Sequence, residues 1–388
     1  MGNGARKEYL AAIRERYRNA GRCAKTAILD EFCANCHYHR KYAIRLLGQR
    51  KRPPPRQRGP KPFYDALVLP HLKALWRATD QMCSKILVGA IPLWLPFYER
   101  EYGTVDPLVR AKLLKLSPAT CDRLLRPIRA RLKSKGKCTT RPGRLLRNVI
   151  PIRPDKSTIP EEGTMDRPGF IEADTVAHCG NSLDGQFAWS ITYTDIKSGW
   201  TDNRAVWGKG AAGVVEQTRA MEATLPFPLI AFWSDNGSEF LNDHLWRYFA
   251  NRKDPVHFAR SRPYKKDDNA HVEQKNWTHV RQLLGYDRID QPQLVPLMNE
   301  IYARWRRYQN HFVPARRLVS KTRINSRWVK KYDAPKTPYQ RLLDSPHVTK
   351  QDKKDLTAVH KTLNPFHLKK EIEKNLRLLF NDLQKHEP

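Results

Sequence analysis

The sequence predicts an α/β protein: a mixed-sheet core flanked by N-terminal all-α domains and a mostly helical, basic C-terminal region. Alternating or short apolar runs typical of strands gather between residues 168 and 260. Before residue 134 and after residue 290, apolar residues recur every three or four positions, which is typical of helices. With 388 residues, 40% of them hydrophobic, the chain can form several globular domains.

Charge indicates the class of partner. The chain has 71 Lys and Arg against 39 Asp and Glu, a formal net charge of +32. This excess favours a polyanionic partner, nucleic acid first; a ribosome-bound or otherwise adhesive basic protein is the alternative. Seven irregularly spaced cysteines favour a reducing compartment. No apolar run approaches the about 20 residues that cross a bilayer, and no secretory signal opens the chain, so we expect a soluble, intracellular protein without a membrane partner.

Residues 1–49 are expected to form three short helices. Tyr9, Ile13 and Tyr17 are spaced as on one helix face, and the segment HRKYAIRLL predicts a basic, amphipathic third helix. We interpret this as a helix-turn-helix DNA-binding domain, whose last helix would bring basic side chains into a groove. These side chains are Arg40, Lys41 and Arg45. The alternative is a plain three-helix bundle with a solvated basic face.

A basic, proline-rich linker (50–62) leads to a second helical domain, 63–134, a candidate second helix-turn-helix. Within it, Ser117 followed by Pro118 predicts a helix start. The helix that follows carries Arg123 and Arg126 as candidate DNA contacts. Residues 135–166 form another basic linker.

Residues 167–312 predict the order β-β-β-α-β-α-β-α, which is that of a ribonuclease-H-like domain. A long amphipathic helix, from Leu294 to Phe312, is expected to close its core. Residues 313–388 form the basic C-terminal region. We expect residues 313–346 to be irregular, with a short hairpin around Arg323 to Val329, and a terminal helix to begin at Asn364 and Pro365.

Three acids occupy matching positions in this domain. Asp174 lies inside the apolar strand IEADTVA, Asp235 ends the strand FWSD, and Glu273 lies on a helix with Asn269 and Asn276 near its face. A carboxylate in an apolar strand is costly unless it binds a cation. Hard divalent cations take oxygen ligands, and two ions about 4 Å apart can stabilise both oxygens of a phosphodiester displacement. Each acid alone would be interpreted as a salt bridge or helix cap; together they predict a catalytic site holding Mg²⁺ or Mn²⁺, with two ions expected.

The segments EADTVAHCG, FWSDNGSEF and NAHVEQKNWTHVR carry a family resemblance. Over roughly residues 165–312 the chain resembles the DDE transposase and retroviral integrase superfamily, and most of all bacterial insertion-sequence transposases. The resemblance implies that Asp174, Asp235 and Glu273 are catalytic metal ligands. It also implies a polynucleotidyl transferase that frees a 3′-hydroxyl at a transposon end and joins it to target DNA. Its partners would be terminal repeats, target DNA and further copies of the chain, in the bacterial cytoplasm on the nucleoid, without a small-molecule cofactor.

Other residues near these acids have two interpretations each. His178 shares a strand face with Asp174 and would contact substrate phosphate or belong to the core. Asn236 would serve the turn or the scissile phosphate. Lys275 and Arg281 would hold DNA backbone or form a generic basic helix face. The pattern Cys33-Ala34-Asn35-Cys36-His37, with His39 near, suggests haem or zinc, but lacks an export signal and a second ligand pair.

Two functions compete with the transposase. One is a non-catalytic DNA-binding regulator derived from a transposase, against which the three intact acids argue. The other is a structure-selective nuclease on the same fold, which would need no sequence-reading helical domains.

Overall fold

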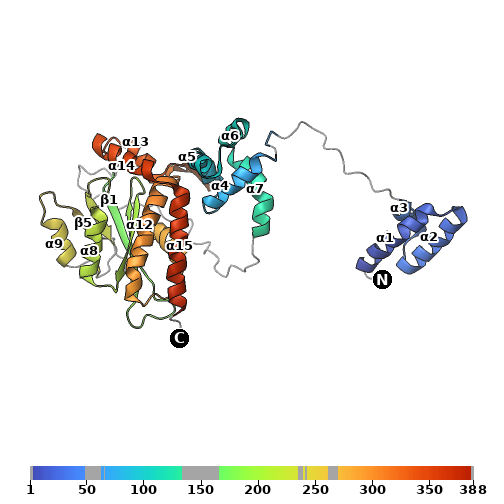
Figure 1. Cartoon of the computed structure of the whole chain (residues 1–388), viewed down its shortest axis with the longest axis horizontal. Helices are drawn as coiled ribbons and strands as arrows, with labels where there is room; N and C mark the ends of the chain where they lie inside the picture. Colours follow the sequence, from blue (N-terminus) through green and yellow to red (C-terminus); the bar gives the residue numbers. More distant parts are fainter. Residues whose placement is uncertain are drawn as a thin grey trace. The chain divides into compact units, whose positions relative to one another are not determined.

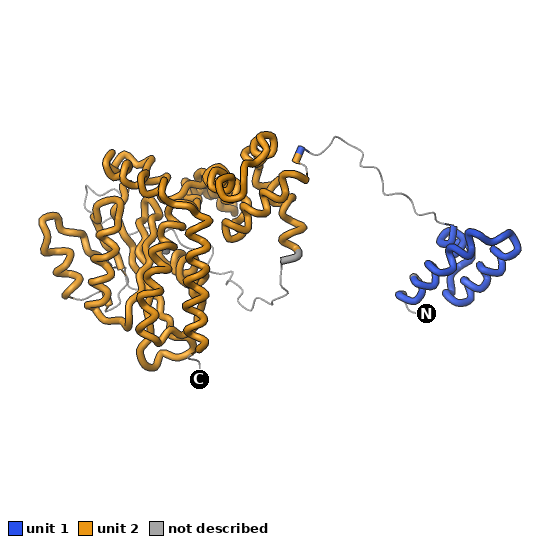
Figure 2. The backbone as a smooth tube through the Cα atoms, viewed as in Figure 1, with its two compact units in different colours: residues 1–63 blue, residues 64–388 orange. Residues whose placement is uncertain are grey.

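The structure is a computed structural model, which describes residues 3–48, 63–64, 66–132, 166–234, 239–240, 243–260 and 270–385. The chain divides into two compact units, Met1–Phe63 and Tyr64–Pro388, coloured separately in Figure 2. Among the described helices, none is long and apolar enough to span a bilayer.

The smaller unit consists of the three helices that the sequence predicts. They are α1 (Asn3–Asn19), α2 (Arg22–Cys36) and α3 (Arg40–Gly48). Their apolar stripes meet in a core around the fully buried Phe32. α2 ends at His37, whose φ of 55° places it in the left-handed region and turns the chain toward α3.

The larger unit begins with four helices. They are α4 (Val68–Ala78), α5 (Ser84–Tyr102), α6 (Pro107–Leu114) and α7 (Pro118–Leu132). The predicted start of α7 is confirmed, because the Thr120 amide donates to Ser117 Oγ at 3.2 Å. The buried side chains of these helices form one core with α12 (Val295–Phe312) and α15 (Pro365–Gln384); the Trp94 indole donates to the Phe312 carbonyl at 2.8 Å.

A five-stranded mixed sheet follows, in the order β3-β2-β1-β4-β5. Its strands are β1 (Phe170–Ala177), β2 (Ala188–Asp195), β3 (Thr201–Trp207), β4 (Ala231–Ser234) and β5 (His257–Arg260). The first three pair antiparallel, and β4 and β5 are added in parallel on the other side of β1. With α8 (Ala211–Glu222), α9 (Asp243–Ala250) and α10 (Ala270–Lys275), the predicted order of elements is confirmed, and it is consistent with a ribonuclease-H-like core.

The two faces of the sheet differ in character. Ile171 and Ala173 of β1 lie in an apolar core with α8 and α9. Alternation places Glu172 and Asp174 on the opposite face, which α10 and α12 cover. Figure 1 shows α8 and α9 on one side of the sheet and α12 and α15 on the other. Glu172 and Asp174 therefore give this second face of the sheet a polar character, and it is called the polar face below.

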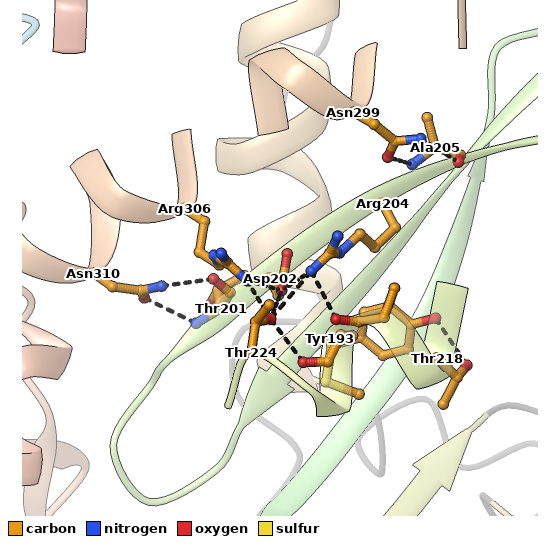
Figure 3. Close-up of polar contacts among 12 residues, drawn as sticks. Tyr193, Thr201, Asp202, Arg204, Ala205, Thr218, Thr224, Asn299, Arg306 and Asn310 are labelled. Carbon is orange, nitrogen blue, oxygen red and sulfur yellow. Dashed lines mark hydrogen bonds and ion pairs between the residues drawn. The ribbon is translucent and has the colours of Figure 1, made fainter. Parts of the chain in front are cut away.

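Helix α12 covers the edge strand β3 through side chains that replace a neighbouring strand (Figure 3). Asn310 accepts from the Thr201 amide at 2.9 Å and donates to the Thr201 carbonyl at 2.8 Å. Asn299 does the same for Ala205, at 2.8 and 3.0 Å. The backbone N–H and C=O groups of two edge-strand residues are thereby satisfied, which removes a site where another chain could pair. Arg306 adds an ion pair to Asp202 at 2.8 Å.

The region after α12 is more regular than the sequence predicts. The hairpin is longer, with β6 (Leu318–Ile324) and β7 (Arg327–Tyr332), and α13 (Pro338–Asp344) falls within the segment expected to be irregular. A helix not predicted, α14 (Lys350–Thr362), precedes α15. The predicted start of α15 is confirmed, because Asn364 Oδ1 accepts the Phe366 amide at 2.9 Å.

Candidate active site

Asp174 lies near the middle of the polar face, in β1 opposite Thr192 of β2. Its side chain is half-buried. Oδ1 accepts the Thr175 amide at 2.8 Å, and Oδ2 accepts Asn276 Nδ2 at 2.7 Å. The carboxylate is thus held by fixed donors on a rigid central strand, which is the kind of support that a precise site needs.

The helix that carries Glu273 lies against the same strand. Asn276, the first residue of the π-helical turn Asn276–Arg281 that continues α10, bonds to Asp174. One turn earlier, the Val272 amide donates to Glu172 Oε2 at 3.1 Å. Glu273 lies between these two attachments in the sequence, with an exposed side chain. The structure therefore brings Asp174 and the Glu273 helix together.

Glu172 is a residue that the sequence interpretation missed. It is 3% exposed, and it binds an amide in the first turn of α10, where backbone N–H groups lack intrahelical partners. A carboxylate there is also favoured by the helix dipole. Two acids at alternate positions of IEADTVA were the available signal, since such residues share one sheet face.

Three of the predicted site residues, Asp235, Asn236 and Asn269, lie outside the described residues. Ser234, which directly precedes Asp235 in the sequence, is the last residue of β4. It pairs with Ala173, the sequence neighbour of Asp174. Within the described ranges, no group of three His, Cys, Asp or Glu side chains is arranged to hold a metal ion, so the metal triad stays a prediction. Asp174 and Glu273 offer carboxylate oxygens, a donor chemistry that fits Mg²⁺ or Mn²⁺.

Glu239, a described residue of the SDNGSEF motif, contacts the other face of β1. It is 1% exposed, accepts Thr175 Oγ1 at 3.0 Å, and forms an ion pair with Lys209 at 2.8 Å. Thr175 adjoins Asp174 in β1, so this contact holds Glu239 beside the strand that carries the acid.

The two cations of the Glu273 helix lie in different surroundings. Burial, together with the nearby Arg317, lowers the pKa of Lys275 to about 8. Arg281 donates to the Ala177 carbonyl at 3.0 Å, and its guanidinium lies 4.6 Å from the centre of the Tyr286 ring. Arg281 thus holds the helix to the end of β1, a role in the fold that the sequence interpretation did not give it.

His178 lies in the core, the second of its two interpretations. It is fully buried, its Nε2 lies 2.7 Å from Ser190 Oγ, and that hydroxyl lies 2.5 Å from Tyr302 OH. Burial lowers the pKa of His178 to about 3, so the ring is neutral. Nδ1 has no hydrogen-bond partner in the part of the chain that the structure describes.

The candidate DNA contacts of the helical domains lie on exposed helix faces. Lys41 and Arg45 are exposed on α3, with Arg45 stacked 4.9 Å from the centre of the Tyr42 ring. Arg40 is exposed and pairs with Asp30. Arg123 and Arg126 are exposed on α7. No metal group is found at Cys33, Cys36 and His37 within the described chain, and Cys36 lies in the core of the smaller unit.

Comparison with known proteins gives a relative over most of the chain. A protein of Sinorhizobium fredii (strain NBRC 101917 / NGR234), named "Uncharacterized protein y4rM", is 38% identical over 338 residues, which cover 87% of this chain and 94% of the relative. The chain belongs to the y4rM family. Membership assigns no activity, since the name of the relative states none. No protein-family model matches the chain.

Among solved structures, the catalytic core domain of BIV integrase matches 46% of this chain and 96% of its own, with 14% identity and a TM-score of 0.28. The strand order and strand directions of this y4rM-family chain are consistent with a ribonuclease-H-like core.

Proposed function

We propose that the chain is an integrase-type DNA transposase, a metal-dependent polynucleotidyl transferase that cleaves at transposon ends and joins the freed 3′-hydroxyl to target DNA. The observation that carries the proposal is the 2.7 Å bond from Asn276 to Asp174, since it holds the Glu273 helix against the strand of the first acid. The register of Ser234 beside Ala173 supports a place for Asp235 at the same site.

The proposed roles follow from the chemistry. Asp174, Asp235 and Glu273 would hold Mg²⁺ or Mn²⁺, two ions in the proposal. Bound metal would supply charge stabilisation at the attacking and leaving oxygens of the phosphodiester. The residues of this chain would orient the carboxylates: Asn276 and the Thr175 amide fix the two oxygens of Asp174. Lys275, half-buried with its pKa lowered to about 8, lies next to Asn276 in the sequence and would add positive charge near substrate phosphate.

Charge and the helical domains support DNA as the substrate. A net charge of +32 favours a polyanion. We propose that residues 1–49 form a helix-turn-helix domain that presents Lys41 and Arg45 to DNA, and that residues 63–134 present Arg123 and Arg126. Two ends must be joined in one event, so the proposal includes a homo-oligomer on DNA, in the cytoplasm and on the nucleoid.

The test uses the full chain and linear duplexes that tile the DNA flanking its coding segment, incubated with Mg²⁺ or Mn²⁺. Wild type is expected to give cleaved ends and strand-transfer products, and Asp174→Asn, Asp235→Asn and Glu273→Gln are expected to lose both. The matched controls Asp287→Asn and Glu216→Gln change exposed acids of the larger unit and are expected to keep both products. If the three site variants behave as wild type, the catalytic proposal fails. Binding without cleavage would support a regulator, and cleavage without joining a nuclease.

A further inference from the structure

Among the described elements of the larger unit, the β6–β7 hairpin is the most exposed. Every strand residue is exposed except Ser320, which is half-buried. The exposed side chains include large apolar ones, such as Trp328 at 45% and Val319 at 69%. A two-stranded hairpin with no buried face is marginally stable in water, so this element is expected to gain stability from a partner.

Charge points to the chemistry of that partner. Residues 318–332 contain Lys and Arg at five positions and neither Asp nor Glu; these positions are Lys321, Arg323, Arg327, Lys330 and Lys331. Lys321 lies directly opposite Lys330 in the ladder. Like charges in directly opposed positions destabilise a hairpin, and a polyanion would offset that cost. Lys321, Arg323, Trp328 and Lys330 share one face, on which the Lys321 ammonium lies 4.6 Å from the Trp328 ring centre.

The base of the hairpin, unlike its strands, is firmly attached. Asp333 accepts from the Arg317 amide and from the Arg341 guanidinium, both at 2.6 Å, and its own amide donates to the Arg317 carbonyl at 2.9 Å. Arg317 also donates to the carbonyl of Ile196, just after β2. The anchored base ties the exposed ribbon to the sheet that carries Asp174.

We propose that the β6–β7 hairpin is a DNA-binding ribbon that enters the major groove of duplex DNA, with its lysines and arginines against the phosphates. The major groove, about 12 Å wide, admits a two-stranded ribbon. The deep, narrow major groove of A-form RNA does not, which favours DNA. The inference rests on the proposed function only in taking DNA as the bound polymer. It adds a DNA contact in the C-terminal region, whose role the sequence does not indicate.

The test measures binding of the full chain to a fluorescent mixed-sequence DNA duplex in EDTA, by anisotropy over a salt series. The hairpin variant is Lys321→Gln, Lys330→Gln and Lys331→Gln combined. The control removes the same charge from α14, through Lys350→Gln, Lys354→Gln and Lys361→Gln, all exposed. The hairpin variant is expected to bind on the order of 10- to 100-fold more weakly and to lose about two to three units of salt slope, since each phosphate contact contributes about 0.9. The control is expected to lose less than about threefold.

Three outcomes separate the inference from the proposed function. Equal losses in hairpin variant and control would overturn the inference, even if strand transfer occurs. Hairpin-dependent binding without strand transfer would support the inference and contradict the proposed function. Equal competition by an RNA duplex would overturn the groove assignment. Thermal melts check folding: removing opposed lysines is expected to leave Tm unchanged or higher, so a weaker binder with a lowered Tm would also count against the proposal.

Discussion

The covered edge of the sheet gives a sharp stability prediction, through Asn310→Ala. Asn310 is 1% exposed, and its amide satisfies both the N–H and the C=O of Thr201 at 2.9 and 2.8 Å. Alanine would leave the N–H and the C=O of Thr201, a buried residue, without these partners. Each buried group that loses its partner costs about 1–3 kcal/mol, so for two groups we expect the free energy of unfolding to fall by about 2–6 kcal/mol.

Urea unfolding followed by tryptophan fluorescence measures this loss. All ten tryptophans lie in the larger unit, between Trp76 and Trp328, so the signal follows that unit alone. The control is Asn251→Ala, an exposed asparagine after α9, which is expected to change stability by less than about 0.5 kcal/mol. If Asn310→Ala and Asn251→Ala unfold at the same urea concentration, the edge-capping argument is wrong.

Three further predictions concern the site. Asn276→Ala removes the hydrogen bond to one oxygen of Asp174 and is expected to raise the Mg²⁺ concentration needed for cleavage by about 10-fold or more, because it removes a residue that orients a proposed metal ligand. An unchanged Mg²⁺ dependence with a lower maximal rate would contradict a positioning role. The pKa of His178 is about 3 in the folded protein against an ordinary value of 6.5, so the folded state loses stability as the pH falls from 6.5 toward 3, by up to about 1.4 kcal/mol per pH unit. Thermal melts from pH 7.5 to 4.5 should therefore show a smaller loss of stability with acid in His178→Gln than in wild type. Arg281→Gln, which loses the hydrogen bond to the Ala177 carbonyl, is expected to lower stability by about 1.5–3 kcal/mol and to leave the salt slope of DNA binding unchanged. Unchanged stability with a smaller salt slope would instead support a DNA contact.

The order of the sheet elements could be predicted because each strand and helix has its own local period. IEADTVA alternates, and the helix from Leu294 to Phe312 keeps a three-four spacing. Helix α14 could not be predicted, because Leu356 is its one buried residue and the pattern of its other positions is typical of a polar loop. The core that α4 to α7 share with α12 and α15 could not be predicted either. An apolar stripe on a helix predicts that this face is buried, but it does not indicate which other element covers it.

The site shows the same division between local pattern and tertiary contact. Asp174 was found because an acid in an apolar strand is locally anomalous. Its bond to Asn276 joins residues that are 102 positions apart, and no sequence pattern indicates which amide meets which carboxylate. Arg281 had two interpretations, a DNA contact or part of a generic basic helix face, because a cation on a helix surface resembles any other. Only the fold shows that it donates to the Ala177 carbonyl.

The polar face of β1 separates two roles that the sequence merges. Glu172 and Asp174 are both acids on one face, yet their partners differ. Glu172 is nearly fully buried and binds a backbone amide at the start of α10, so its negative charge is used by the fold. Asp174 is half-buried, and its oxygens accept from the Thr175 amide and from the Asn276 side chain. A fold that needed only a stable core would be served as well by apolar residues at both positions, because buried charge seldom adds net stability. The helix whose first-turn amide donates to Glu172 is the helix that carries Glu273. The buried structural acid Glu172 and the more exposed Asp174 thus lie on one face, which is why we interpret the polar face as a site for chemistry.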